Sequence, residues 1–128
     1  MSALADFAEN LVLDWLMTTG SATRPTSWYV ALYTAAPNDA GGGTEVTGAG
    51  YTRQSVSFAA ASGGVASNSN QVTFTASGGD YGTITHIGIH DAVSGGNLIW
   101  HGSLAASRSV VDGDSFIFAI GAIDLTID

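Results

Sequence analysis

The sequence predicts a mainly β protein: a single β-sandwich or jelly-roll-like domain of about seven to eight strands, preceded by one N-terminal amphipathic helix. Three observations predict this fold. Apolar residues recur at helical spacing within residues 2–19, short runs of strand-forming residues separated by turn signals fill residues 26–128, and a length of 128 residues suits one hydrophobic core. We therefore expect one domain spanning residues 1–128.

The predicted helix covers residues 2–19, with Ser2 placed to cap its start and Gly20 to end it. Its apolar stripe either covers an open face of the chain's own β-domain or docks on a neighbouring subunit. An intermediate arrangement is favoured, in which the first three side chains of the stripe pack within the domain and the last reaches outward. In chain order, the stripe consists of Leu4, Phe7, Leu11 and Trp15.

The strongest strand signal is Trp28–Tyr33, which is apolar or aromatic on both faces and therefore predicts a central strand. The clearest hairpin joins Gly82–Asp91 to Asn97–Leu104 through a glycine pair that permits a short reversal. Gly121 indicates a bulge or bend between the last two strands. The remaining predicted segments are strands at Tyr51–Phe58, Gln71–Thr75, Ser115–Ile120 and Ala122–Asp128, and loops at Ala36–Gly50 and Ala59–Ser69.

The charge balance excludes several partners. The net charge is −8, and the three cations are all arginines scattered along the chain. Binding a phosphate backbone requires several cations on one face, and adsorption to anionic lipid requires a basic cluster, so neither nucleic acid nor membrane is an expected partner. Acidic residues interrupt the apolar N-terminal stretch, which is unlike a signal peptide, and no apolar run is long enough for a membrane span.

Low charge also points to assembly. Charged residues make up 11% of the chain, well below the ~25% of an ordinary soluble domain. Such a surface predicts a homo-oligomer, with a trimer favoured over a dimer. The expected contact residues are the helix stripe and the aromatic residues of the central strand, namely Phe7, Leu11, Trp15, Trp28, Tyr29 and Tyr33.

No catalytic, cofactor or metal site is predicted. His86 and His90 are four residues apart, which on a strand separates them by ~13 Å, too far to bind one ion together. His101 lies on the partner strand of the hairpin and could approach one of them across the sheet. The Asp112–Asp114 segment reads as a turn, because no nearby residues complete a calcium shell. The chain has no cysteine, and no serine or threonine lies in a recognisable nucleophile motif.

A sugar-binding surface is the alternative from another functional class. It would be formed chiefly by the loop Ala36–Gly50 and Tyr81, with a host-surface glycan as ligand. Aromatic residues in a small β-domain more often serve as core or interface anchors. The aromatic residues considered for such a surface are Trp28, Tyr29, Tyr33, Tyr51, Tyr81 and Trp100.

Several segments resemble a family of small tailed-phage proteins, often labelled tail fibre protein or minor structural protein. The resemblance rests on the runs Trp28–Phe58, Gly82–Asp91, Gly95–Leu104 and Asp112–Phe118, and it spans nearly the whole chain. It implies a component of the virion exterior, made in the host cytoplasm, with no catalytic residues to carry over. Its expected role is to decorate or cement the capsid in contact with major capsid protein, with a tail fibre, tail tip or adaptor role as the alternative.

Overall fold

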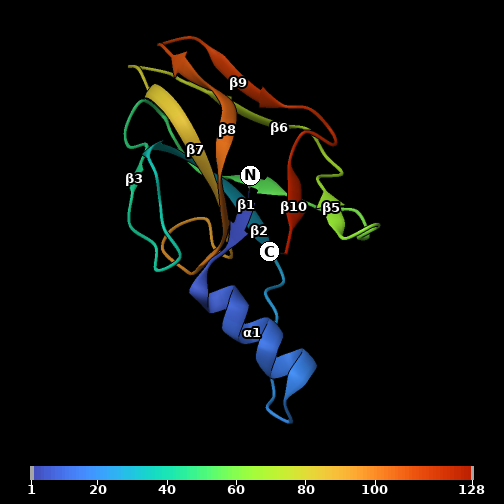
Figure 1. Cartoon of the computed structure of the whole chain (residues 1–128). Helices are drawn as coiled ribbons and strands as arrows, with labels where there is room; N and C mark the ends of the chain where they lie inside the picture. Colours follow the sequence, from blue (N-terminus) through green and yellow to red (C-terminus); the bar gives the residue numbers. More distant parts are fainter. Residues whose placement is uncertain (1, 128) are drawn as a thin grey trace.

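The computed structural model describes residues 2–127 and is mainly antiparallel β with one helix (Figure 1), as the sequence predicts. Ten strands are present instead of seven to eight, because several strands of two or three residues are too short to show an alternating pattern. The elements are β1 (Ser2–Leu4), α1 (Asp6–Met17), β2 (Trp28–Ala35), β3 (Thr44–Glu45), β4 (Gln54–Val56), β5 (Val65–Ser67), β6 (Val72–Thr75), β7 (Gly82–His90), β8 (Leu98–Val110), β9 (Ser115–Phe118) and β10 (Asp124–Thr126).

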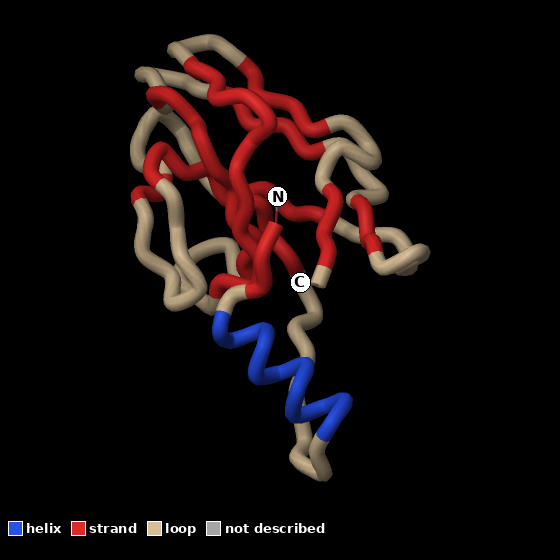
Figure 2. Tube along the Cα trace, in the orientation of Figure 1, coloured by secondary structure: helices blue, strands red, loops and turns tan. Residues whose placement is uncertain are grey.

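The largest layer is a six-stranded sheet in the order β1-β8-β7-β2-β3, with β4 also paired to β2. β2 therefore has neighbours on both edges, which confirms the prediction of a central strand over Trp28–Tyr33. The β7–β8 hairpin is also confirmed, and β8 continues past the predicted end at Leu104 to Val110. The backbone trace in Figure 2 shows these long strands beside two small ribbons.

The two ribbons are β6–β9 and β5–β10, and they pack against one face of the six-stranded sheet. Val30 and Leu32 of β2 are fully buried in this shared core, together with Phe74 of β6. The chain passes from one ribbon to the other at Gly121, whose φ of +80° accommodates a turn where the sequence predicts a bulge or bend. Asp128, the last residue of the predicted C-terminal strand, lies outside the described residues.

The helix is shorter than the predicted range of residues 2–19. Residues Ser2–Leu4 pair with β8 as a strand, since the edge of β8 offers backbone hydrogen-bonding groups there. The helix consequently begins at Asp6 with Ala5 at the N-cap position, and it ends at Met17. The prediction that Ser2 caps the helix and Gly20 ends it was therefore wrong, and Leu4 belongs to a strand.

Candidate functional site

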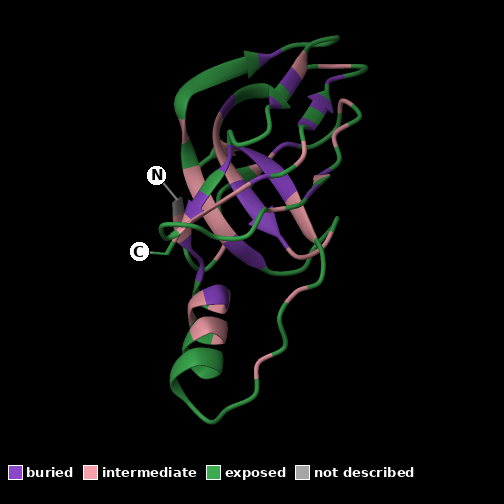
Figure 3. Cartoon of the chain, turned by 90° about the vertical axis from the view of Figure 1, so that its right-hand side faces the viewer, coloured by how far each residue is buried: buried purple, intermediate pink, exposed green. Residues whose placement is uncertain are grey.

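The helix α1 projects from the β-body and touches it only near its own start (Figures 1 and 3). Ala8 is its one buried residue among those described, and it packs with Leu4 and Ile99. Phe7 and Leu11 are half-buried. The end of the helix exposes four large apolar side chains: Leu13 (55%), Trp15 (69%), Leu16 (62%) and Met17 (72%). The helix is thus not laid across the chain's own sheet.

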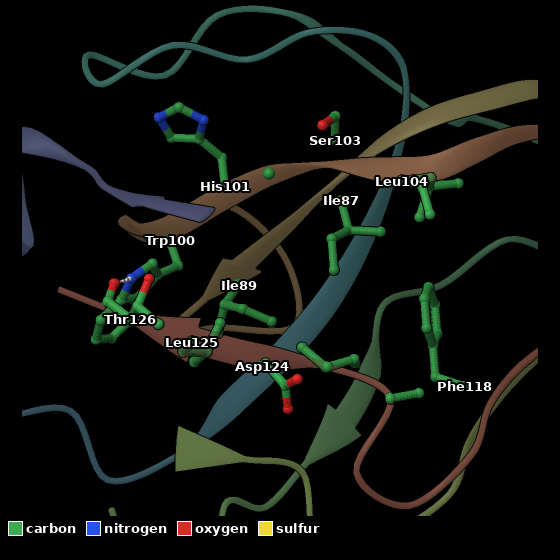
Figure 4. A pocket seen from close by; sticks show the side chains of 14 residues that line it. Ile87, Ile89, Trp100, His101, Ser103, Leu104, Phe118, Asp124, Leu125 and Thr126 are labelled. Atoms are coloured by element: carbon green, nitrogen blue, oxygen red, sulfur yellow. Dashed lines mark hydrogen bonds between the residues drawn. The ribbon is translucent and has the colours of Figure 1, made fainter. Parts of the chain in front are cut away.

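An apolar groove of about 640 Å³ lies between the six-stranded sheet and the β10 strand. Figure 4 shows Ile87, Ile89 and Leu104 on its sheet side, whereas His101 and Ser103 project from the opposite side of β8. The other side of the groove includes Phe118 of β9, Leu125 of β10 and Ile123, which directly precedes β10. Aliphatic and aromatic groups therefore supply the larger share of the groove lining, and polar residues supply the rest.

Trp100 connects the two sides of this groove. Its indole Nε1 donates a hydrogen bond of 2.9 Å to the Thr126 carbonyl oxygen, which fixes β10 against the sheet. A second hollow of about 210 Å³, lined by Trp28 and Phe58 among others, shares Trp100, Ile89 and Leu125 with the groove. The two hollows therefore adjoin.

Asp124 lines the groove, but its carboxylate accepts a hydrogen bond from the Ser67 hydroxyl of the neighbouring strand β5. Figure 4 shows this carboxylate on the side of β10 away from Ile87 and Ile89. The acidic group is thus held at the margin of the groove by its own ribbon, which leaves the space between sheet and ribbon without a facing charge.

An ion pair between buried Arg53 and half-buried Glu45 fastens the loops next to β2. The Arg53 guanidinium binds both carboxylate oxygens of Glu45, through Nε and NH2 at 2.9 Å each. Its NH1 group donates to the carbonyls of Ala92 and Gly95 in the β7–β8 turn, at 2.9 and 2.8 Å. Arg53 thereby joins the segment before β4 to the tip of the central hairpin.

Tyr51 extends this network into the core. Its hydroxyl donates to Glu45 Oε2 at 2.6 Å and accepts a hydrogen bond from the Leu32 backbone N–H at 3.1 Å. Burial alone raises the pKa of Glu45, but hydrogen bonds from Arg53 and Tyr51 outweigh burial and lower it. The carboxylate is therefore held ionised as an acceptor for both neighbours.

Tyr33 and His90 form a second buried pair, at 2.8 Å between the tyrosine hydroxyl and His90 Nε2. Gly88 makes room for it, because a Cβ there would lie 2.9 Å from the Tyr33 ring. Desolvation and then the Arg53 charge lower the pKa of His90 to about 4, and burial raises the pKa of Tyr33 to about 12. Tyr33 is only 4% exposed. The prediction that it contacts a partner is therefore corrected, because its side chain is covered by its own chain.

The other predicted contact residues divide between the helix and the sheet. Trp28 and Tyr29 are half-buried on β2, whereas Trp15 is exposed at the end of α1. The structure therefore separates the predicted interface into one exposed helical part and one partly covered sheet part. Tyr81, considered for sugar binding, is buried and donates its hydroxyl hydrogen bond to the Thr75 carbonyl, so it is unavailable to a ligand.

The histidines are each engaged separately. His86 Nδ1 lies 2.8 Å from the Thr85 hydroxyl, and His101 Nε2 lies 2.8 Å from Asp39 Oδ1. In the Asp112–Asp114 turn, Asp112 accepts a hydrogen bond from the Gly78 amide. These side chains thus have local structural partners.

One carboxylate cluster escaped the sequence analysis. Ligand oxygens of Asp6, Glu9 and Asp39 lie within 4.8 Å of one another, where the start of α1 meets the loop after β2. Such a group could receive a cation, but exposed carboxylates commonly gather without one. Asp39 is thirty residues from Glu9 in the sequence, so spacing carried no signal for this cluster. Across residues 2–127 no helix has the length and apolar character that crossing a bilayer requires.

Comparison with known families relates this chain to a phage fibre protein family. A family model described as Podophage GP4 fiber I protein gp80 matches residues 3–126, which is nearly the whole chain. No curated protein matches the sequence. The matched range includes both the projecting helix and the apolar groove.

Proposed function

Because the chain belongs to the Podophage GP4 fiber I protein gp80 family, we propose that it is a non-enzymatic structural subunit of a phage fibre, placed on the virion exterior. The observation that carries this proposal is the projecting helix α1. Its end presents Trp15, Leu16 and Met17 to solvent, each more than 60% exposed. A helix end of this kind gains stability when a protein partner covers it.

The surface area agrees with an assembling subunit. The chain exposes 6860 Å², whereas a compact monomer of 13.0 kDa exposes roughly 6300 Å². The projecting helix accounts for this excess qualitatively, since it is packed only near its start. The partners proposed are further copies of the chain, as a trimer or secondly a dimer, and other virion proteins at the fibre attachment point.

A structural role also follows from the chemistry of the hollows. The groove between β8 and β10 is lined mainly by apolar groups, and a small-molecule site needs a few convergent polar groups to orient its ligand. The polar groups of Glu45, Arg53 and Tyr51 bind one another and backbone atoms, so they fasten loops instead of facing an open cleft. These features favour a building block over an enzyme or a sugar-binding module.

Copy number in purified particles tests the fibre proposal against capsid decoration. Quantitative mass spectrometry of virions should give a small copy number, set by the number of fibres, when compared with the major capsid protein. Labelled antibody should locate the chain at the tail in electron micrographs. A copy number comparable with that of the major capsid protein would support decoration of the shell and overturn the fibre assignment.

A further inference from the structure

We propose that the end of α1 of one copy docks in the apolar groove of the next copy, so that helix-in-groove contacts hold the oligomer together. This inference rests on the proposed function as a homo-oligomeric fibre subunit and identifies the contact between its copies. The two surfaces are the helix end, defined by Leu13, Trp15, Leu16 and Met17, and the groove between β8 and β10.

The helix end has the character of an inserted element. Successive residues turn by about 100° around a helix, so the four apolar residues within 13–17 cover an arc of about 200°. Asp14 is the one charged residue in these last turns. An apolar face of this width is normally covered by another element. Figure 1 shows α1 leading away from β8 and β10, the strands that line the groove, so the end of α1 is not positioned over the groove of its own chain.

The groove has the complementary character. Ile87, Ile89 and Leu104 line its sheet side, and Figure 4 shows no charged side chain directed between them and β10. A volume of about 640 Å³ is large enough to admit several large side chains. Apolar side chains of a helix, spaced at three and four residues, are the usual occupants of such a groove.

Charge favours this contact over a bundle of α1 helices. The helix carries Asp6, Glu9 and Asp14 and no basic residue, so pairing the helices of two copies would bring acidic groups together. In the groove arrangement, Trp15 and Leu16 can enter the apolar space while Asp14 stays at its margin, about 100° away from Trp15 around the helix. Copies with a net charge of −8 repel one another overall, so contacts free of facing acids are favoured.

The contact is heterologous, because it joins two different surfaces of the same chain. Contacts of this type close into a ring when the rotation between copies permits and otherwise form a filament. A closed trimer would contain one helix-in-groove contact for each copy. Every copy then covers both of its apolar surfaces, which a two-fold contact between helices would not achieve.

Complementation between two variants tests this contact. The helix variant is W15E/L16E, at two exposed positions, and the groove variant is L104E, at a half-buried position. Each variant alone should sediment as a monomer at a concentration where the unmodified chain forms oligomers. An equimolar mixture should form dimers and nothing larger, because only one intact helix and one intact groove remain between the two chains.

The control is I117E, which places the same charge on an exposed apolar position outside the groove and should leave the oligomer intact. Oligomers of unchanged mass with L104E, or no dimer in the mixture of folded variants, would overturn the groove contact. A monomeric unmodified chain at tens of micromolar would also overturn it. Particle copy number, measured independently, tests the fibre assignment, so the two proposals fail separately.

Cross-linking covers the case in which L104E does not fold. The chain has no cysteine, so the pair L16C and L104C introduces the only two thiols. Oxidation should link different copies through these positions, giving covalent oligomers on a non-reducing gel. The pair L16C and I117C is the matched control and should give no defined ladder. Equal cross-linking by both pairs would overturn the proposal.

Discussion

Replacing Arg53 by Met should lower the free energy of unfolding by about 3–5 kcal/mol, since removal of one partner from a buried ion pair leaves an uncompensated charge. Arg53 and Glu45 have side chains that are only 8% and 24% exposed. Met preserves much of the aliphatic stem but cannot bind the carboxylate or the two turn carbonyls. A loss of this size is a large part of the ~5–15 kcal/mol that stabilises a typical domain.

The magnitude follows from four hydrogen bonds. The guanidinium donates two of 2.9 Å to Glu45, one of 2.9 Å to Ala92 and one of 2.8 Å to Gly95. Hydrogen bonds to charged groups contribute about 1.5–3 kcal/mol each, so a simple sum exceeds the expected loss. The actual loss should be smaller, because Glu45 is partly exposed and the Ala92–Gly95 turn can admit water after the substitution.

Urea denaturation followed by circular dichroism measures this loss, and Arg108→Met provides the matched control. Arg108 is exposed, lies 5.3 Å from the Phe116 ring centroid and makes one hydrogen bond of 3.4 Å, so its replacement should cost about 1 kcal/mol or less. In a double-mutant cycle with Glu45→Gln, the two losses should not add. Additive losses, or a loss below 1 kcal/mol for R53M, would refute the argument that this pair fastens the loops.

Three further outcomes are expected. Trp15→Ala should cost less than ~1 kcal/mol of folding stability, because the side chain is exposed, but it should weaken assembly. Leu4→Ala, at a buried position, should cost about 2–5 kcal/mol of folding stability. Equal folding losses for the two variants in denaturation curves would contradict this division. The pKa of His90 is lowered to about 4, so between pH ~4 and ~6.5 the unfolded chain binds more protons than the folded chain. The folding stability should therefore be fully present above pH ~6.5 and fall by up to about 3 kcal/mol toward pH ~4. In pH-dependent urea melts H90Q should flatten this fall, and an unchanged pH dependence in H90Q would contradict the assignment. Chelator should leave the thermal midpoint unchanged. A drop of many degrees in calorimetry would instead reveal a bound ion, for which the carboxylates of Asp6, Glu9 and Asp39 are the candidate ligands.

The sequence was sufficient to predict elements whose pattern is local. Trp28–Tyr33 is apolar on both faces, which predicts a central strand. In the structure this strand is paired along both edges. Gly95 and Gly96 both adopt positive φ in the β7–β8 turn, as the glycine pair predicts. The helical period also gave the correct element type, since the chain is helical over Asp6–Met17.

Element boundaries and the shortest strands depended on tertiary contacts. Residues Ser2–Leu4 continue a helical pattern in the sequence, but the backbone groups of β8 hold them as a strand. The gain from pairing a strand edge therefore outweighed the local preference for helix. β3 and β5, with two and three residues, exist only because a partner strand lies beside them.

The candidate contact surfaces show the same division. The sequence by itself determined that α1 carries a broad apolar stripe, that Trp15 lies on it and that few charges interrupt the surface. Only the tertiary structure decided that Tyr33 is buried against His90 and that Arg53 meets Glu45. It also decided that the helix end is left uncovered and that a groove stays open between β8 and β10. The physical reason is that periodicity records which face of an element is apolar, whereas the neighbour that covers this face is set by how distant segments pack.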